Sequence, residues 1–196
     1  MKKTPLNLVV ESAERTVVNY FTPAPTDRVK TALPVRELSK SGQLVLWSIR
    51  RWVQRSRLGG SVDTALKSTY TLAGIPEAQK SFEELMTLLA TVALRHVVVE
   101  CQCSEFLSSD ELLIIHTLRS LQSGHREIAE RRIARIIVGK LGSTFCRIGE
   151  DYVRSLRNSG FSLNQISALS TALLRNSWLS LNQTSQRCLP LLLIVA

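Results

Sequence analysis

Residues 119–124 read R-S-L-Q-S-G and residues 154–160 read R-S-L-R-N-S-G, and this near-repeat indicates the fold more clearly than any other stretch. Each phrase ends a segment whose apolar residues recur at helical spacing, and a similar segment follows each glycine. Each phrase thus predicts a helix, a short turn and a second helix, and this unit occurs twice, about 35 residues apart. Ser108 and Glu111 have the spacing of a capping box, which predicts a helix start at that point. The sequence therefore predicts two C-terminal helical hairpins, over 109–139 and 143–180.

Apolar periodicity also predicts helices before the two hairpins. They lie at 8–21, 41–58, 62–73 and 76–95. Between the last of them and the hairpins, residues 96–104 contain three consecutive valines and alternating cysteines, which favour an extended segment. The predicted fold is all-α, an irregular antiparallel bundle of about six to eight helices with one short extended segment near 96–104.

Three prolines between residues 22 and 38 predict an extended linker, because proline breaks helices and biases the preceding residue away from the α conformation. At the other end of the chain, an Asn-, Gln-, Ser- and Thr-rich stretch indicates a loop before a final apolar run. We therefore expect an N-terminal arm and linker over 1–38, a helical domain over 39–180, and a polar loop with an apolar tail over 181–196.

The charge of the chain is strongly basic, with a formal net charge of +9, and residues 1–60 hold 11 Lys and Arg against four Asp and Glu. Such a balance favours an acidic partner, which includes nucleic acid, an anionic membrane surface or an acidic protein. Four cysteines are too few for a disulfide framework, and the early apolar stretch ends at Glu11, short of a secretory signal. No apolar run reaches the length of a membrane-spanning helix. We therefore expect a cytoplasmic protein with reduced thiols.

Two predicted helices carry clusters of arginine that we expect to face solvent. The helix 41–58 also contains tryptophan, so it has either a binding face or a core-facing side with solvated arginines opposite. The helix 126–139 places its arginines opposite an apolar stripe. Arginine is the basic side chain best suited to protein interfaces. The residues predicted to bind a partner are Trp47, Arg50, Arg51, Arg55, Arg57, Arg131, Arg132 and Arg135.

The chain lacks the sequence patterns of the common enzyme and cofactor sites. It has no Gly-x-Ser-x-Gly elbow, no dinucleotide-binding glycine pattern and no His-Glu-x-x-His pair, so neither catalysis nor a cofactor is predicted. Cys101, Cys103 and His116 have the chemistry of metal ligands. Their Cys-x-Cys spacing differs from the usual Cys-x-x-Cys of zinc sites, so no metal site is predicted there.

These observations predict a non-enzymatic cytoplasmic scaffold or adaptor, because paired helical hairpins form surfaces that bind other proteins. The alternative is a nucleic-acid-binding regulatory protein that uses the Arg-rich helix 41–58. The eight-residue apolar run Leu189–Ala196 would either cover a groove of the bundle or join two copies of the chain into a homo-oligomer.

Overall fold

The computed structural model describes residues 30–57 and 64–163, and these residues are mostly helical. In chain order the elements are β1 (Lys30–Pro34), the 3-10 helix η1 (Val35–Glu37), α2 (Lys40–Arg57), α3 (Thr64–Leu72), α4 (Pro76–Val92), β2 (Phe106–Ser108), α5 (Ser109–Gln122), α6 (Arg126–Ile133) and α7 (Gly139–Asn158). The predicted all-α bundle is confirmed. The expected helices at 8–21 and 163–180 and the tail 181–196 lie outside the described residues.

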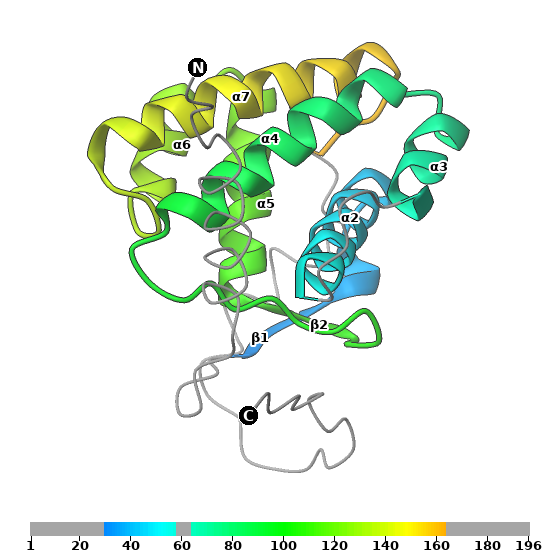
Figure 1. The fold of residues 1–196 in the computed structure, drawn as a ribbon, viewed down its shortest axis with the longest axis horizontal. Coiled ribbons are helices and arrows are strands. Elements are labelled where there is room, and N and C mark those ends of the chain that lie inside the picture. The colour runs from blue at the N-terminus through cyan, green and yellow to red at the C-terminus, as the bar shows by residue number, and fades with distance from the viewer. Residues whose placement is uncertain (1–29, 58–63, 164–196) are drawn as a thin grey trace, which may run out of the picture.

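α5 is the central helix of the bundle. It packs against α2, α6 and α7 and against both strands, while α4 and α7 lie side by side across the top of the view (Figure 1). α3 lies at one end of this arrangement and α6 at the other. The expected capping box starts α5, because Ser108 Oγ accepts a hydrogen bond from the backbone N–H of Glu111, and Glu111 Oε2 accepts one from that of Ser108. Across the described ranges, none of the helices has the length and hydropathy that crossing a membrane requires.

The repeated sequence phrase forms the same helix end twice. Gly124 after α5 and Gly160 after α7 have φ angles of +77° and +81°, in the left-handed region that favours glycine. The next residue in each case donates its N–H to a carbonyl five residues earlier, from His125 at 2.8 Å and from Phe161 at 2.9 Å. This is the hydrogen bond of a Schellman motif, and the same bond follows Gly74 at the end of α3. The repeated phrase therefore marks a helix end of the Schellman type. α3 ends in the same way, although its sequence at that point is different.

A pairing between two loop segments sets three helix boundaries that differ from the predictions. The N–H of Leu94 donates to the carbonyl of Ile136 at 2.7 Å. Because residues 94 and 136 pair with each other, α4 ends at Val92 and α6 ends at Ile133. The sequence predicted that these helices would extend to residues 95 and 139. α7 then begins at Gly139, so the segment expected to be a turn before residue 143 is the first turn of a helix.

Residues 30–38, which the sequence assigned to the linker, pack with the helical domain. β1 pairs antiparallel with β2, with Lys30 opposite Ser108 and Pro34 opposite Phe106. Leu33 and Leu38 are buried in the core. The two-stranded sheet therefore joins the start of the described chain to the segment that leads into α5.

α7 packs closely on α5 at Gly149. A Cβ atom placed there would lie 2.6 Å from Cδ1 of Leu121, which is too short for two carbon atoms in contact. Gly142, two turns earlier in α7, offers a comparison, because a Cβ there would lie 3.6 Å from Cγ2 of Ile133, an ordinary contact. The close packing of α7 on α5 thus depends on the missing side chain at Gly149.

The Gly149→Ala substitution should therefore destabilise the protein and Gly142→Ala should not. For Gly149→Ala we expect a loss of about 1–2 kcal/mol in the free energy of unfolding, because overpacking outweighs the higher helix propensity of alanine. For Gly142→Ala we expect a gain of up to about 1 kcal/mol, from helix propensity alone. Chemical denaturation of both variants provides the test, and equal effects of the two would contradict the close approach at Gly149.

Candidate interaction surface

Arg50, one of the predicted binding residues, lies inside the protein and is 4% exposed. Its Nε and Nη2 donate to the two carboxylate oxygens of Glu111 at 2.8 and 3.0 Å. Nη1 and Nη2 also donate to the carbonyl oxygens of Ser104 and Phe106, each at 2.8 Å. A buried charge needs such complete pairing to be tolerated. The expectation that Arg50 is exposed is therefore wrong. The Arg50 side chain connects α2 through hydrogen bonds to α5 and to the residues around β2.

Carboxylates at the start of α5 also bind the backbone of the segment before β2. Glu111 Oε1 accepts from the N–H of Glu100 at 3.1 Å, and Asp110 Oδ2 accepts from that of Val98 at 2.8 Å. Arg95 pairs with both oxygens of Asp110, at 2.7 and 2.8 Å. Side chains thus satisfy backbone groups that would otherwise bind in a sheet or a helix. Residues 96–101 thus lie outside the described helices and strands, and acidic side chains of α5 serve as hydrogen-bond partners of their backbone.

The other predicted binding residues of α2 are only partly accessible. Trp47, Arg51 and Arg55 are half-buried, and Arg57 is the only exposed arginine in this described helix. Trp47 packs against the core, and its carbonyl oxygen accepts a hydrogen bond from Nε2 of Gln102 at 3.2 Å. α2 therefore does not present the continuous positive face that binding to a phosphate backbone favours.

The arginines of the second predicted cluster lie on α6 and in the turn after it. Arg131 and Arg135 are exposed, as expected from the sequence. Arg132 is half-buried, and its Nη1 donates to the carbonyl of His116 at 3.1 Å and to Oγ of Ser120. Arg132 therefore lies against α5, while its two neighbours in the cluster face solvent.

Three exposed apolar residues belong to the same end of the bundle as Arg131 and Arg135, where α4 ends, α6 lies and α7 begins (Figure 1). Leu94 is 58% exposed, Val138 52% and Leu141 41%. The pairing of Leu94 with Ile136 brings the end of α4 beside the α6–α7 connection. Lys140 is exposed between Val138 and Leu141 in the sequence. We call this surface the α6 corner, defined by Leu94, Arg131, Arg135, Val138, Lys140 and Leu141.

The basic side chains of the α6 corner have no counterion in the part of the chain that the structure describes. The side chains of Arg131, Arg135 and Lys140 form neither a hydrogen bond nor an ion pair with another described residue. Of the acidic residues of α6, Glu130 is paired with Arg126, and Glu127 is exposed. The corner thus combines three apolar side chains with three exposed positive charges, a composition that suits an acidic, partly apolar partner.

Sequence reasoning missed the apolar part of the α6 corner. It placed Val138 near the end of a helix and Leu94 within the helix 76–95, and it gave neither residue a role in binding. Both face solvent because the loop pairing ends the two helices early. The signal that was present in the sequence is the pair of consecutive buried isoleucines, Ile136 and Ile137, whose β-branched side chains favour an extended conformation.

Two of the candidate metal ligands, Cys101 and Cys103, interact with each other, whereas the third, His116, belongs to α5. Cys101 and Cys103 are exposed in the turn before β2, and His116 lies on α5 beside Arg132. Within residues 30–57 and 64–163, no group of three or more His, Cys, Asp or Glu side chains is arranged to hold a metal ion. The cationic neighbours of His116 would also repel a metal ion.

The described thiols differ in their expected reactivity. Burial, with smaller contributions from the charges of nearby Glu130 and Glu150, raises the pKa of Cys146 to about 12. The reactive form of a thiol is the thiolate, so Cys146 should not react with a maleimide at neutral pH while the protein is folded. Cys101 and Cys103 are exposed and should react, although partial burial and then contact with Cys103 raise the pKa of Cys101. Peptide mapping by mass spectrometry after labelling tests this, and modification of Cys146 as fast as Cys101 would show that α7 opens.

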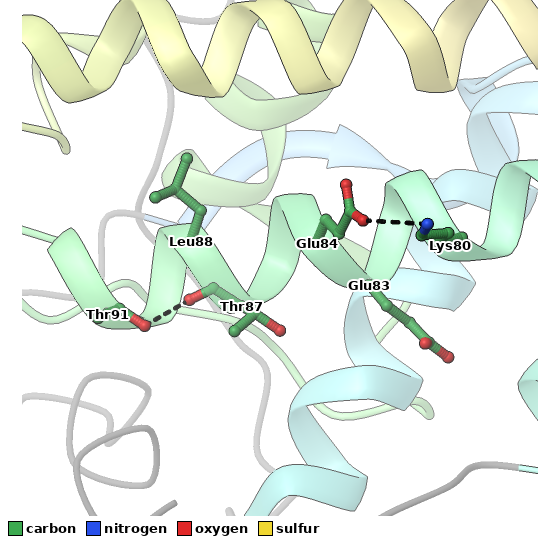
Figure 2. Close-up of a pocket in the computed structure, with 6 residues that line it drawn as sticks. All are labelled: Lys80, Glu83, Glu84, Thr87, Leu88 and Thr91. Atoms are coloured by element: carbon green, nitrogen blue, oxygen red, sulfur yellow. Dashed lines mark hydrogen bonds and ion pairs between the residues drawn. The ribbon is translucent and has the colours of Figure 1, made fainter. Parts of the chain in front are cut away.

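A surface hollow of about 440 Å³ lies along α4 (Figure 2). All six residues that line it come from this one helix: Lys80, Glu83, Glu84, Thr87, Leu88 and Thr91. Glu84 is paired with Lys80 at 4.0 Å, and Glu83 points to a different side of the helix (Figure 2). Two carboxylates that diverge in this way do not form an acid–base pair around a substrate. The hollow therefore does not suggest a catalytic site.

Comparisons with known proteins provide no guide to this surface. The chain matches no protein-family model, and no curated protein or solved structure is significantly similar to it. The functional interpretation therefore depends on the chemistry of the described residues.

Proposed function

We propose that this protein is a non-enzymatic helical adaptor that binds an acidic segment of a partner protein at the α6 corner. The observation that carries the proposal is the combination of Leu94, Val138 and Leu141, all exposed, with nearby positive charges that lack a counterion among the described residues. Exposed apolar side chains that lie together on a soluble domain are typical of interaction sites.

The charge of the corner specifies the chemistry of the partner. Arg131 on α6 and Arg135 in the turn after it are both exposed, and each guanidinium can bind a carboxylate of the partner segment. The apolar side chains provide the area that becomes buried, while the arginines at its margin select against basic partners. The partner segment should therefore contain both acidic and large apolar residues.

A protein partner is favoured over nucleic acid at this site for two reasons. A nucleic-acid backbone gains little from contact with three aliphatic side chains, whereas an amphipathic peptide buries them. The α2 helix, which the alternative proposal uses, has Arg50 buried and a single exposed arginine, Arg57. Nucleic-acid binding is the competing proposal, and titration of the protein with DNA and with an acidic peptide distinguishes the two.

The proposal also includes a location in the cytoplasm and a homo-oligomer. Exposed Cys101 and Cys103 are compatible with a reducing cytoplasm, where we propose that the protein acts. A homo-oligomer formed through the apolar run Leu189–Ala196 is a further part of the proposal, and this run lies outside the described residues. Neither point determines which segment binds the α6 corner.

Selection from a peptide-display library tests the proposal, with the full-length protein as bait. We expect enriched peptides to combine Asp or Glu with Leu, Ile, Phe or Trp. The double substitution Arg131→Glu/Arg135→Glu should abolish this enrichment, because it places like charges opposite the peptide. The substitution Val138→Asp tests the apolar part separately and should also abolish it.

A matched control reverses two charges at sites remote from the corner. Arg36 on η1 and Lys67 on α3 are exposed, and α3 lies at the opposite end of the bundle from α6 (Figure 1). The double substitution Arg36→Glu/Lys67→Glu changes the net charge by the same amount as the α6 variant and should leave the selected peptides unchanged. Enrichment of purely acidic peptides, lost equally in both double variants, would show a generic charge effect and refute the proposal.

A further inference from the structure

A second group of basic side chains lies between α5 and α6, apart from the exposed α6 corner. His116 and Arg119 are three residues apart on α5, a spacing that makes them neighbours on the helix surface. Arg132 reaches across from α6, where its Nη1 donates to the carbonyl of His116 at 3.1 Å and to Oγ of Ser120. All three side chains are half-buried. We call this group the α5–α6 cation cluster.

The electrostatics of the cluster are consistently positive. Burial lowers the pKa of His116, and the charges of Arg132 and then Arg119 lower this pKa further. Among the described residues, the charged groups that act on His116 are thus both guanidinium groups, one from its own helix and one from the helix packed against it. The imidazole is therefore neutral at neutral pH, beside two permanent positive charges.

Arg132 keeps part of its hydrogen-bonding capacity. Its Nη1 is used within the protein, while Nε and Nη2 have no hydrogen-bond partner in the described part of the chain. The two bonds of Nη1 hold the planar group in place, so little conformational entropy is lost when the other two nitrogens bind a ligand. An orientated guanidinium with two free donors is suited to the oxygens of a tetrahedral anion.

We propose that the α5–α6 cation cluster binds a tetrahedral oxyanion, sulfate or phosphate, between Arg119 and Arg132 with His116 as the third group. The anion would bind in a half-buried position, where charges interact more strongly than in water. The ligand is either a free inorganic anion or a phosphate ester on another molecule, and these share the same recognition chemistry. The site is separate from the α6 corner and does not depend on the function proposed for that surface.

The site should bind its ligand more tightly at lower pH. Sulfate keeps its charge between pH 5 and pH 8, so any change in its affinity over this interval comes from the protein. Protonation of His116 adds a third positive charge, so sulfate affinity should rise as the pH falls through the pKa of this residue. By linkage, bound sulfate should raise the pKa of His116 from its lowered value.

NMR of the histidine side chains in the full chain provides the test, because the sequence has three histidines, His96, His116 and His125. The protein is titrated with sulfate at several pH values, with sodium chloride used to keep the ionic strength constant. We expect a saturable change in the His116 signals and a higher His116 pKa in sulfate. A change that does not saturate, or that chloride reproduces, would overturn the proposal.

Two neighbouring arginines supply the matched variants. Arg132→Gln should weaken sulfate binding at least about tenfold, because hydrogen bonds to charged groups contribute about 1.5–3 kcal/mol. Arg131→Gln, which removes an exposed charge one residue away, should change affinity less than about twofold, as expected for a screened surface charge. Equal losses in the two variants would refute a specific site. Arg132→Lys keeps the positive charge but lacks the planar guanidinium group with its several N–H donors. It provides the same test if Arg132→Gln does not fold.

A third variant and a pair of peptides complete the design. His116→Gln should retain sulfate binding at neutral pH and lose the increase at acidic pH; an unchanged increase would contradict the role of His116. Inorganic phosphate is then compared with a phosphoserine peptide and its unmodified counterpart. Tighter binding of the phosphopeptide identifies a phosphate ester as the ligand, and equal binding of phosphate and phosphopeptide identifies the free anion. The absence of saturable binding for both inorganic phosphate and the phosphopeptide would overturn the site.

Discussion

Replacement of Glu111 by leucine is expected to lower the free energy of unfolding by about 3–5 kcal/mol, the range typical of removing one partner from a buried ion pair. The substitution leaves the guanidinium of Arg50 buried without its carboxylate. It also removes the acceptor of two backbone N–H groups, those of Glu100 and Ser108. Equilibrium denaturation with urea measures the change, and the midpoint should fall while far-UV circular dichroism of the native state stays helical.

Two controls separate burial from charge in this experiment. The double substitution Arg50→Met/Glu111→Leu should recover part of the loss, because no unpaired charge remains inside the protein. Glu84 forms an exposed ion pair with Lys80, and Glu84→Leu should change the stability by less than about 1 kcal/mol. A loss for Glu111→Leu as small as that for Glu84→Leu would show that the Arg50 pair is accessible to water.

The second large effect is expected from Phe82→Ala, which should reduce the free energy of unfolding by about 3–5 kcal/mol. Phe82 is fully buried on α4, and its ring centroid lies 5.9 Å from that of Tyr70 and 5.6 Å from that of Tyr152. The hydroxyl groups of these two tyrosines are hydrogen-bonded to each other at 2.8 Å. The three rings join α3, α4 and α7, so a cavity at Phe82 loosens three helices together.

Phe106→Ala is the matched control for Phe82→Ala. Its side chain is 42% exposed on β2, so the same truncation removes less buried surface and should reduce stability by at most about 1 kcal/mol. Thermal and urea denaturation of the two variants provide the comparison. Similar losses for both would contradict the assignment of Phe82 to the centre of the core.

Local patterns predicted the helices well where their ends depend on local chemistry. The capping box at Ser108 and Glu111 and the glycine at 124 gave the bounds of α5 correctly, because both motifs act through hydrogen bonds within a few residues. The ends of α4 and α6 were predicted too late. They depend on the pairing of Leu94 with Ile136, and these residues are far apart in the sequence.

The same contrast between local and distant contacts applies to the candidate sites. The sequence placed Arg50 with its neighbours on a basic face, because helical periodicity does not show that a carboxylate 61 residues away lies within hydrogen-bonding distance. Arg131 and Arg135 were predicted correctly to be exposed: Arg131 lies opposite the buried Ala129 and Ile133 on α6, and Arg135 lies in the turn after it. The apolar part of the α6 corner comes from two loops, and its assembly is a consequence of tertiary structure.

The most direct test of the adaptor proposal is a fluorescence-anisotropy titration at physiological ionic strength. The most enriched acidic peptide and a random-sequence DNA duplex are each titrated with the wild type, with Arg131→Glu/Arg135→Glu, and with the control Arg36→Glu/Lys67→Glu. We expect saturable peptide binding that falls at least about tenfold in the α6 variant alone, because like charges facing each other cost several kcal/mol, and no saturable binding of DNA. Saturable DNA binding by the wild type, or a peptide affinity that the α6 substitutions leave unchanged, would contradict the proposal.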